Sequence, residues 1–212
     1  MAVSGIILAG GRSLRMGRDK TLLLYKSETL IERAVKTLRS IVDEIIIASN
    51  HIEKYSIPGV LEVPDVYSGK GPLGGMHAGL SAAQYEYAFV ISCDMPFYSE
   101  KVALHLLDRR NEYDAIVPEI CGRWEPLCAV YSKKCVEPIT NCLQADVKKV
   151  SLFYQQIRVL KINESELRQY GDINKMFYNL NTPEDLSALD LKEKQVVCSR
   201  RAYHDEEGNK DG

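Results

Sequence analysis

A pair of glycines near the start of the chain is followed at once by a cluster of positive charge. Gly10 and Gly11 end an apolar run, and the next nine residues hold four cations and one acid: Arg12, Arg15, Arg18, Lys20 and Asp19. Glycine has no side chain, so successive backbone N–H groups of such a turn can converge on an anion. The pattern predicts a loop that binds several phosphate groups, with a glycine turn and solvated arginines as the simpler alternative.

An aspartate at the end of a predicted strand supplies a second chemical group. Residues 88–93 form a continuous apolar run, which predicts a buried strand, and Asp94 follows it. Open α/β sheets bind ligands beyond the carboxyl ends of their strands. Mg²⁺ takes one or two protein carboxylates beside phosphate oxygens and water. We therefore predict that Asp94 binds Mg²⁺, the alternative being that it only caps the turn before Pro96.

Arg15 and Lys20 are the candidate catalytic residues beside Asp94. They would hold the phosphates and stabilise a leaving pyrophosphate, which is positioning and electrostatic work rather than covalent catalysis. The chain contains no nucleophile elbow, no H-E-x-x-H, no C-x-x-C and no Walker string, and its four histidines show no ligand spacing. The residues therefore favour a phosphate-binding protein that needs no covalent nucleophile.

Alternating strand and helix patterns must position these groups. Apolar runs predict strands at 6–9, 44–48, 61–63, 88–93, 115–117, 127–131 and, at a sheet edge, 157–162. Helical spacing and capping residues predict helices at 30–38, 76–84, 99–107, 135–143, 150–154 and 183–189. The predicted fold is a three-layer α/β domain with a mostly parallel central sheet and helices on both faces.

Length and composition suit one domain. The chain has 212 residues, so we predict a single domain over 1–191 and a charged, disordered tail over 192–212. Its net charge of −2 provides no field that would recruit nucleic acid. The start lacks the features of a signal peptide, and no run reaches the roughly 18 apolar residues of a membrane helix. These features predict a cytoplasmic protein without membrane contact.

Six cysteines are present, and four of them recur every seven residues from Cys121 to Cys142. Pro126 and Pro138 interrupt that span, so a heptad helix does not explain the spacing. We predict small apolar core residues, with a metal site as the alternative.

The string G-K-G-P-L-G at 69–74 also matches a dinucleotide-binding fingerprint, and Asp94 lies 20 residues beyond it. Two features count against this interpretation. No apolar strand leads straight into Gly69, and Pro72 constrains a turn that would have to wrap a pyrophosphate. A nicotinamide oxidoreductase remains an alternative that a titration with NAD would decide.

Residues 8–20 read L-A-G-G-R-S-L-R-M-G-R-D-K. This string resembles the signature loop of nucleotidyltransferases, and its second glycine favours the branch of molybdenum cofactor guanylyltransferases. Four further strings stand in the order of that family: G-P-L-G-G-M at 71–76, C-D-M-P-F at 93–97, P-L-C-A-V-Y at 126–131 and N-x-N-T-P-E-D-L at 179–186. The resemblance spans residues 3–190 and implies the family's Rossmann-like nucleotidyltransferase fold.

The resemblance also implies roles for individual residues. The first loop would bind GTP through Leu8, Ala9, Gly10, Gly11 and Lys20. Asp65 is similar to the family's guanine-side acid, which accepts hydrogens from guanine N1 and N2, and Asp94 is similar to its magnesium ligand. The family often has asparagine where the second strand ends. In this sequence Ala48 stands at that place, and Asn50, two residues later, is the candidate for the role of the asparagine.

The implied reaction transfers GMP from GTP to molybdenum-bound molybdopterin and releases pyrophosphate. The acceptor would lie near 123–126, Asn179 and Asn181, and proteins that deliver molybdopterin or chaperone molybdoenzymes would be transient partners. Two alternatives stay open. One is a related transferase that uses CTP or a sugar-phosphate acceptor, and the other is a carrier that binds the nucleotide or cofactor without turning it over.

Overall fold

The computed structural model describes residues 2–10, 20–50, 53–180 and 185. Residues 1–179 form one compact unit and residues 180–212 a second, and the fold below is that of the first. The helix predicted to start after Thr182 and the boundary between the predicted domain and its tail lie outside the described residues. Both stay predictions.

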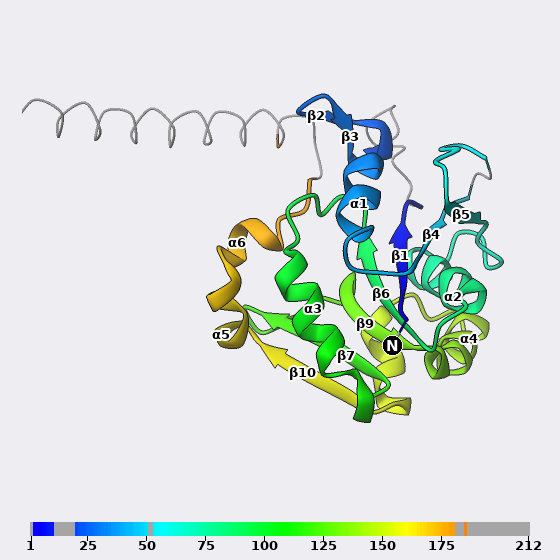
Figure 1. Ribbon diagram of the computed structural model, residues 1–212. Helices are drawn as coiled ribbons and strands as arrows, with labels where there is room; N and C mark the ends of the chain where they lie inside the picture. Colours follow the sequence, from blue (N-terminus) through cyan, green and yellow to red (C-terminus); the bar gives the residue numbers. More distant parts are fainter. Residues whose placement is uncertain (1, 11–19, 51–52, 181–184, 186–212) are drawn as a thin grey trace, which may run out of the picture. The chain divides into compact units, whose positions relative to one another are not determined.

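The first unit is built on a mixed sheet of eight strands (Figure 1). The strands lie in the order β10, β7, β9, β6, β1, β4, β5, and β8 pairs with β7. Their bounds are β1 (Ser4–Leu8), β4 (Glu44–Ala48), β5 (Val60–Val63), β6 (Tyr87–Ser92), β7 (Ala115–Ile120), β8 (Arg123–Trp124), β9 (Cys128–Ser132) and β10 (Val159–Asn163). β5, β4, β1 and β6 pair in parallel, as do β7 and β10, whereas β9 and β8 pair antiparallel to their neighbours. The predicted mostly parallel sheet is confirmed.

Helices cover both faces of the sheet, which gives the three predicted layers (Figure 1). Ile7 and Ile47 belong to the core that contains buried residues of α1 (Leu30–Leu38) and α3 (Glu100–Asp108). Their neighbours Ile6 and Ile46 belong to the core that contains residues of α2 (Pro72–Ala82) and α4 (Val136–Gln144). Successive side chains of a strand point to opposite faces, so a core on each face explains why these strands are apolar without alternation.

The start of α1 agrees with the sequence. Thr29 is the N-cap: its hydroxyl accepts from the backbone N–H of Glu32, whose carboxylate accepts from the Thr29 N–H. This reciprocal capping box satisfies two backbone donors that a helix start would otherwise leave open. The short hairpin of β2 (Leu24–Tyr25) and β3 (Glu28–Thr29) leads into this cap.

The start of α2 differs from the prediction of residue 76. The helix begins at Pro72, with Gly71 as N-cap at φ 66° and ψ −151°. Proline suits the first helical position, where its missing N–H costs nothing and its φ is already helical. Gly74 and Gly75 hid the apolar periodicity of this first turn, because glycine carries no side chain.

Other differences are local. The short strand β8 occupies residues 123–124, where no strand was predicted, and the predicted helix at 150–154 is the 3-10 helix Val150–Gln156. Two one-turn helices, α5 (Glu164–Leu167) and α6 (Ile173–Met176), were not predicted. Ser99 occupies the N-cap of α3, but its side chain makes no capping hydrogen bond. The edge position of the strand predicted at 157–162 is confirmed by β10. Further single 3-10 turns lie at Lys20–Leu22, Arg110–Glu112, Lys133–Cys135 and Arg168–Tyr170.

The cysteines behave mainly as core residues. Four thiols are buried: Cys93, Cys128, Cys135 and Cys142. Cys121 is exposed in a turn at φ 50°, so the core prediction was wrong for this residue, and Cys198 lies outside the described residues. Among the residues that the structure describes, no group of three or more histidine, cysteine, aspartate or glutamate side chains could hold a metal ion. No helix in the described part of the chain is long and apolar enough to cross a membrane.

Gly79 is the point at which α2 packs most closely on β1. A Cβ atom at this position would lie 2.5 Å from Cγ2 of Ile6, which is fully buried. We therefore expect Gly79→Ala to lower the free energy of unfolding by about 1–3 kcal/mol, as overpacked cores do. Denaturant unfolding measures the loss. Ser81→Ala, at an exposed position of the same helix, should leave the stability unchanged, and equal stability of both variants would contradict the predicted clash.

Candidate functional site

Three neighbouring strands deliver the candidate residues to one edge of the sheet. Leu8 at the end of β1 pairs with Ala48 of β4 on one side and with Ser92 of β6 on the other. All three strands run in the same direction (Figure 1), so the residues two places further on, Gly10, Asn50 and Asp94, follow adjacent strand ends. Parallel neighbours are about 4.8 Å apart. The crevice outside such strand ends is where open α/β sheets bind ligands.

Gly10 lies between two of the predicted nucleotide-binding residues. A Cβ atom at Gly10 would be 3.9 Å from the Asn50 amide nitrogen Nδ2 and 3.9 Å from Asp65 Oδ2. The structure therefore brings Gly10, Asn50 and Asp65 together, although Asp65 follows the edge strand β5 and is 55 positions from Gly10 in the sequence. Of the two places considered for the family's asparagine, Asn50 is beside Gly10, whereas the Ala48 side chain is buried in the core. Gly11 and Arg15 lie outside the described residues.

Asp65 is held against the beginning of α2. Cβ atoms at Gly74 and Gly75 would each lie 3.5 Å from an oxygen of its carboxylate, so the two glycines leave room for it. Its Oδ1 is buried and accepts no hydrogen bond from the described residues. Burial raises the pKa of the Asp65 carboxyl above the ordinary value of 3.8. A buried acceptor without a donor is costly, and a ligand with two N–H groups side by side would satisfy it.

Asp94 and Lys20 form the opposite, charged part of the site. The Lys20 ammonium is 3.8 Å from Asp94 Oδ2, and the two side chains are 20% and 23% exposed. Asp94 Oδ1 is buried and has no hydrogen-bond partner among the described residues. The thiol of the adjacent Cys93 is not an alternative anion, because burial raises its pKa to about 12.

The Asp94 carboxylate fits Mg²⁺ held jointly with a ligand. Its unpartnered oxygen is a hard donor, as this ion prefers, and Mg²⁺ needs only one or two protein carboxylates when phosphate oxygens and water complete its shell.

The segment after Lys20 is anchored by residues that the sequence did not single out. Thr21 is buried, and its hydroxyl accepts a hydrogen bond of 3.0 Å from the Tyr55 hydroxyl. Glu62 in turn accepts from the backbone N–H groups of Lys54, Tyr55 and Ser56. Burial raises the pKa of Tyr55, which keeps its hydroxyl a donor. The contact between Thr21 and Tyr55 joins residues 34 positions apart, so no local pattern reveals it.

The glycine string at 69–74 does not continue a strand. β5 ends at Val63, and residues 64–68 separate it from Gly69. Gly69 and Gly71 have φ values of 75° and 66°, so they supply the turn into α2. The strand that leads into a glycine turn at its carboxyl end is β1, which Gly10 follows.

Aromatic rings gather where the second substrate was expected. Trp124 packs edge-on against Tyr154 at 5.4 Å between ring centroids, and the hydroxyls of Tyr154 and Tyr131 are 2.7 Å apart. The Tyr131 hydroxyl donates to the carbonyl of Pro126 at 2.8 Å. Burial raises the pKa of the neighbouring Glu125 carboxyl. Asn181 lies outside the described residues.

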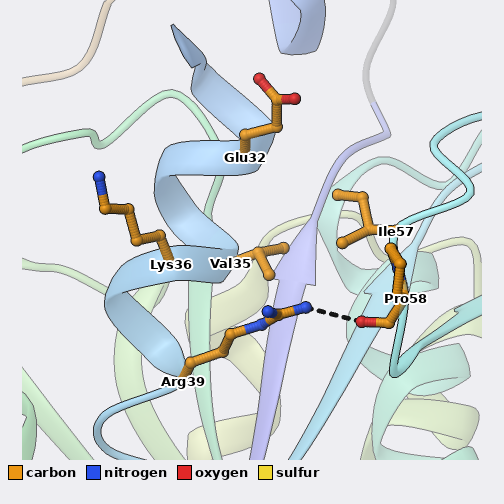
Figure 2. Close-up of a pocket in the computed structure, with 6 residues that line it drawn as sticks. All are labelled: Glu32, Val35, Lys36, Arg39, Ile57 and Pro58. Carbon is orange, nitrogen blue, oxygen red and sulfur yellow. Dashed lines mark hydrogen bonds between the residues drawn. The ribbon is translucent and has the colours of Figure 1, made fainter.

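A separate hollow of about 260 Å³ lies between α1 and residues 57–58 (Figure 2). Val35 and Ile57 supply apolar surface, and Arg39 Nη2 donates to the Pro58 carbonyl at 2.6 Å. It shares no residue with the candidate site at the strand ends.

Comparison with known proteins identifies the relatives of this chain. Residues 5–159 match the family described as the MobA-like NTP transferase domain. A protein of Pelotomaculum thermopropionicum named probable molybdenum cofactor guanylyltransferase is 40% identical over 186 residues, which cover 88% of this chain and 91% of that protein. The molybdenum cofactor guanylyltransferase of Desulfosudis oleivorans is 37% identical over 187 residues, covering 87% and 93%.

Solved structures share the fold. Molybdopterin-guanine dinucleotide biosynthesis protein A from Archaeoglobus fulgidus superposes with a TM-score of 0.75 at 23% identity, covering 93% of this chain and 99% of that one. The 2-C-methyl-D-erythritol 4-phosphate cytidylyltransferase of Thermus thermophilus gives 0.68 at 18% identity, covering 89% and 97%. At such identities the likeness concerns the fold alone.

Proposed function

This chain belongs to the family of MobA-like NTP transferase domains, and from that premise we propose that it transfers GMP from GTP to molybdenum-bound molybdopterin. A terminal phosphate oxygen of molybdopterin attacks the α-phosphorus of GTP. One P–O bond forms, the bond from the α-phosphorus to the bridging oxygen breaks, and pyrophosphate leaves. The observation that carries this proposal is the meeting of Gly10, Asn50 and Asp65 at the same sheet edge as the Lys20–Asp94 pair.

The part of the site around Gly10 binds the nucleoside. Leu8, Ala9, Gly10 and Gly11 present backbone to GTP, and the bare Gly10 lets the ligand approach. The Asp65 carboxylate accepts hydrogens from guanine N1 and N2, and cytosine cannot offer this pair of donors. Asn50 lies beside Gly10 with amide groups that can donate and accept. The unpartnered Asp65 Oδ1 supports this assignment.

The charged part acts on the phosphates. Lys20 donates to the phosphate chain and stabilises the charge that accumulates on the departing pyrophosphate. Arg15 shares this work. Asp94 holds Mg²⁺, which when bound neutralises phosphate charge and polarises the α-phosphoryl group. Because the acceptor brings its own phosphate, the chain's contribution is alignment and electrostatic stabilisation.

Molybdopterin, partner proteins and the cellular compartment complete the proposed reaction. The aromatic wall at Trp124 and Tyr154 is the side from which molybdopterin would approach. Proteins that deliver molybdopterin or receive the dinucleotide are transient partners, and the cytoplasm is the place of action. The net charge of −2 provides no field that would recruit nucleic acid, so the binding of anionic substrates must come from local charges.

Incubation of the protein with labelled GTP, Mg²⁺ and molybdenum-loaded molybdopterin tests the reaction. We expect pyrophosphate and a product heavier than the acceptor by one GMP residue. CTP in place of GTP should give neither. Nucleotide binding without pyrophosphate release would favour a carrier, and faster turnover of CTP would reverse the assignment of the base.

The pH dependence of GTP binding should report Asp65. Guanine needs the ionised carboxylate, so affinity is lost as pH falls through the Asp65 pKa. Since burial raises this pKa above 3.8, the loss begins at a higher pH than for an ordinary aspartate. Isothermal titration across pH should show this loss in the wild type, whereas Asp65→Asn should bind GTP weakly at every pH.

The same shift predicts an opposite effect on stability. A raised folded pKa means that the native protein binds more protons than the unfolded chain, so this group's contribution to stability is lost as pH rises from 3.8 through the folded pKa. Without nucleotide, Asp65→Asn should therefore unfold at a temperature equal to or higher than the wild type at neutral pH. A variant that both melts lower and binds weakly would point to a structural role for Asp65.

A further inference from the structure

Arg33, on α1, joins two loops that belong to the proposed site. Its Nε donates to the backbone carbonyl of Pro96 at 2.9 Å, and its Nη1 is 3.5 Å from Glu28 Oε1 in β3. Its guanidinium carbon also lies 5.2 Å from the ring centroid of Tyr25 and 5.8 Å from that of Phe97. The two rings meet edge to face at 5.4 Å. One side chain thus contacts the β2–β3 hairpin and residues 96–97 together.

Each of these segments begins at a charged residue of the site. The hairpin follows Lys20 through a single 3-10 turn, Lys20–Leu22, and its Tyr25 is only 2% exposed. Pro96 and Phe97 follow Asp94 after one intervening residue, Met95, and Pro96 is buried. Arg33 contacts the segments that follow Lys20 and Asp94, so we place it behind the pair rather than in it.

We propose that Arg33 is a positioning residue that sets the spacing between Lys20 and Asp94. The proposal rests on the proposed function of that pair. The guanidinium fork is planar and can donate in two directions while its face rests on aromatic rings. These contacts reach two segments of the chain, the hairpin and residues 96–97, so they hold both against α1. Lys20 and Asp94 then face the phosphates at 3.8 Å from each other without having to reorganise.

The positions of Lys20 and Asp94 relative to the phosphates affect the rate more than the attraction between the two side chains does. A misplacement of about 1 Å can cost about 100-fold in rate. Partners behind a metal ligand typically account for about 10–100-fold in metal affinity or activity. The contacts of Arg33 join the hairpin to residues 96–97 rather than to Gly10 or Asp65, so its loss should spare the binding of the nucleoside.

The test compares Arg33→Met with Lys36→Met. Methionine keeps a long apolar side chain between the rings but cannot donate to the Pro96 carbonyl. Lys36 is the matched control, because it lies on the same helix and its ammonium is 3.6 Å from the same Glu28 oxygen, but its side chain is 75% exposed. The first measurement is Mg²⁺-dependent binding of a fluorescent GTP analogue, and the second is kcat and KM for pyrophosphate release.

For Arg33→Met we expect that the Mg²⁺ concentration needed for half of the Mg²⁺-dependent binding of the GTP analogue will rise about tenfold. We also expect kcat to fall about tenfold, while binding of the analogue without Mg²⁺ and KM for GTP change less than about twofold. Arg33→Lys should be intermediate, since it keeps the charge over the rings but not the fork. Lys36→Met should match the wild type throughout.

Equal behaviour of Arg33→Met and Lys36→Met would overturn the proposal, as would a uniform loss of GTP binding with or without Mg²⁺. If thermal unfolding shows that Arg33→Met is not folded, Phe97→Leu removes one of the two rings instead and should reproduce the shift in Mg²⁺ requirement. A wild type that releases no pyrophosphate would contradict the proposed function, yet the Mg²⁺ titration would still decide the role of Arg33.

Discussion

Replacement of Asp94 by asparagine should lower the rate of pyrophosphate release by about 10²–10³-fold, the usual effect of removing one group that stabilises transition-state charge. Asparagine keeps the shape of the side chain but removes the negative charge that Mg²⁺ requires. The fold should persist, because Asp94 Oδ1 makes no hydrogen bond to the described residues and the pair with Lys20 is partly exposed. A phosphate-release assay coupled to pyrophosphatase measures the rate, and circular dichroism checks the fold.

Binding of GTP without Mg²⁺ separates this role from a general loss of the site. The Asp94 carboxylate repels phosphates when no cation is bound, so Asp94→Asn should bind metal-free GTP at least as tightly as the wild type. Asp108→Asn removes an exposed carboxylate at the end of α3 and should leave both rate and binding unchanged. If Asp94→Asn turned over at the wild-type rate, the assignment of the metal ligand would be wrong.

Gly10→Ala should lower kcat/KM for GTP by about 100-fold, because a misplacement of a bound ligand by about 1 Å can cost that much in rate. The added methyl group would lie 3.9 Å from Asn50 Nδ2 and from Asp65 Oδ2, which is ordinary van der Waals contact. The free protein therefore accommodates it without strain. Bound GTP would clash with the methyl group, because it occupies the space in which the backbone at residue 10 and the nucleotide approach each other.

The melting temperature distinguishes this effect from misfolding. Gly10→Ala should unfold within about 1 °C of the wild type in the absence of nucleotide, because nothing buried is displaced. It should also lose most of the thermal stabilisation that GTP gives the wild type. Gly79→Ala provides the reverse pattern, with lower stability and, while folded, unchanged affinity. A Gly10→Ala protein that still gained full stabilisation from GTP would place the nucleotide elsewhere.

Much of the framework could be predicted because its causes are local. Strand β4 has the predicted bounds, and β1 and β6 begin or end within two residues of them. A strand buried on both faces must be apolar at every position, which leaves a signal readable over a few residues. The capping box of Thr29 and Glu32 is likewise complete within one turn. The placement of Asp94 just beyond β6 followed from the same reasoning.

Prediction from the sequence failed where an element or residue depends on a partner far away in the chain, or where glycines leave no side-chain pattern. The start of α2 was placed four residues late because its glycines carry no periodicity. β8 is only two residues long and exists because it pairs with β7. Cys121 was predicted, like the other cysteines, to be a small apolar core residue, but it occupies an exposed turn. Arg33 carried no recognisable motif, since its partners Pro96 and Phe97 are about 60 positions away.

The sequence by itself determined where the longer strands lie, that they are buried, and which glycine and aspartate residues follow them. These signals are local, because hydrophobic periodicity and glycine turns act over neighbouring residues. Only the tertiary structure decided that Asp65, from beyond an edge strand, would lie beside Gly10. It also decided that one arginine would hold the segments behind Lys20 and Asp94. The physical reason is that strand order and packing between layers bring together residues whose separation in the chain carries no information about their distance in space.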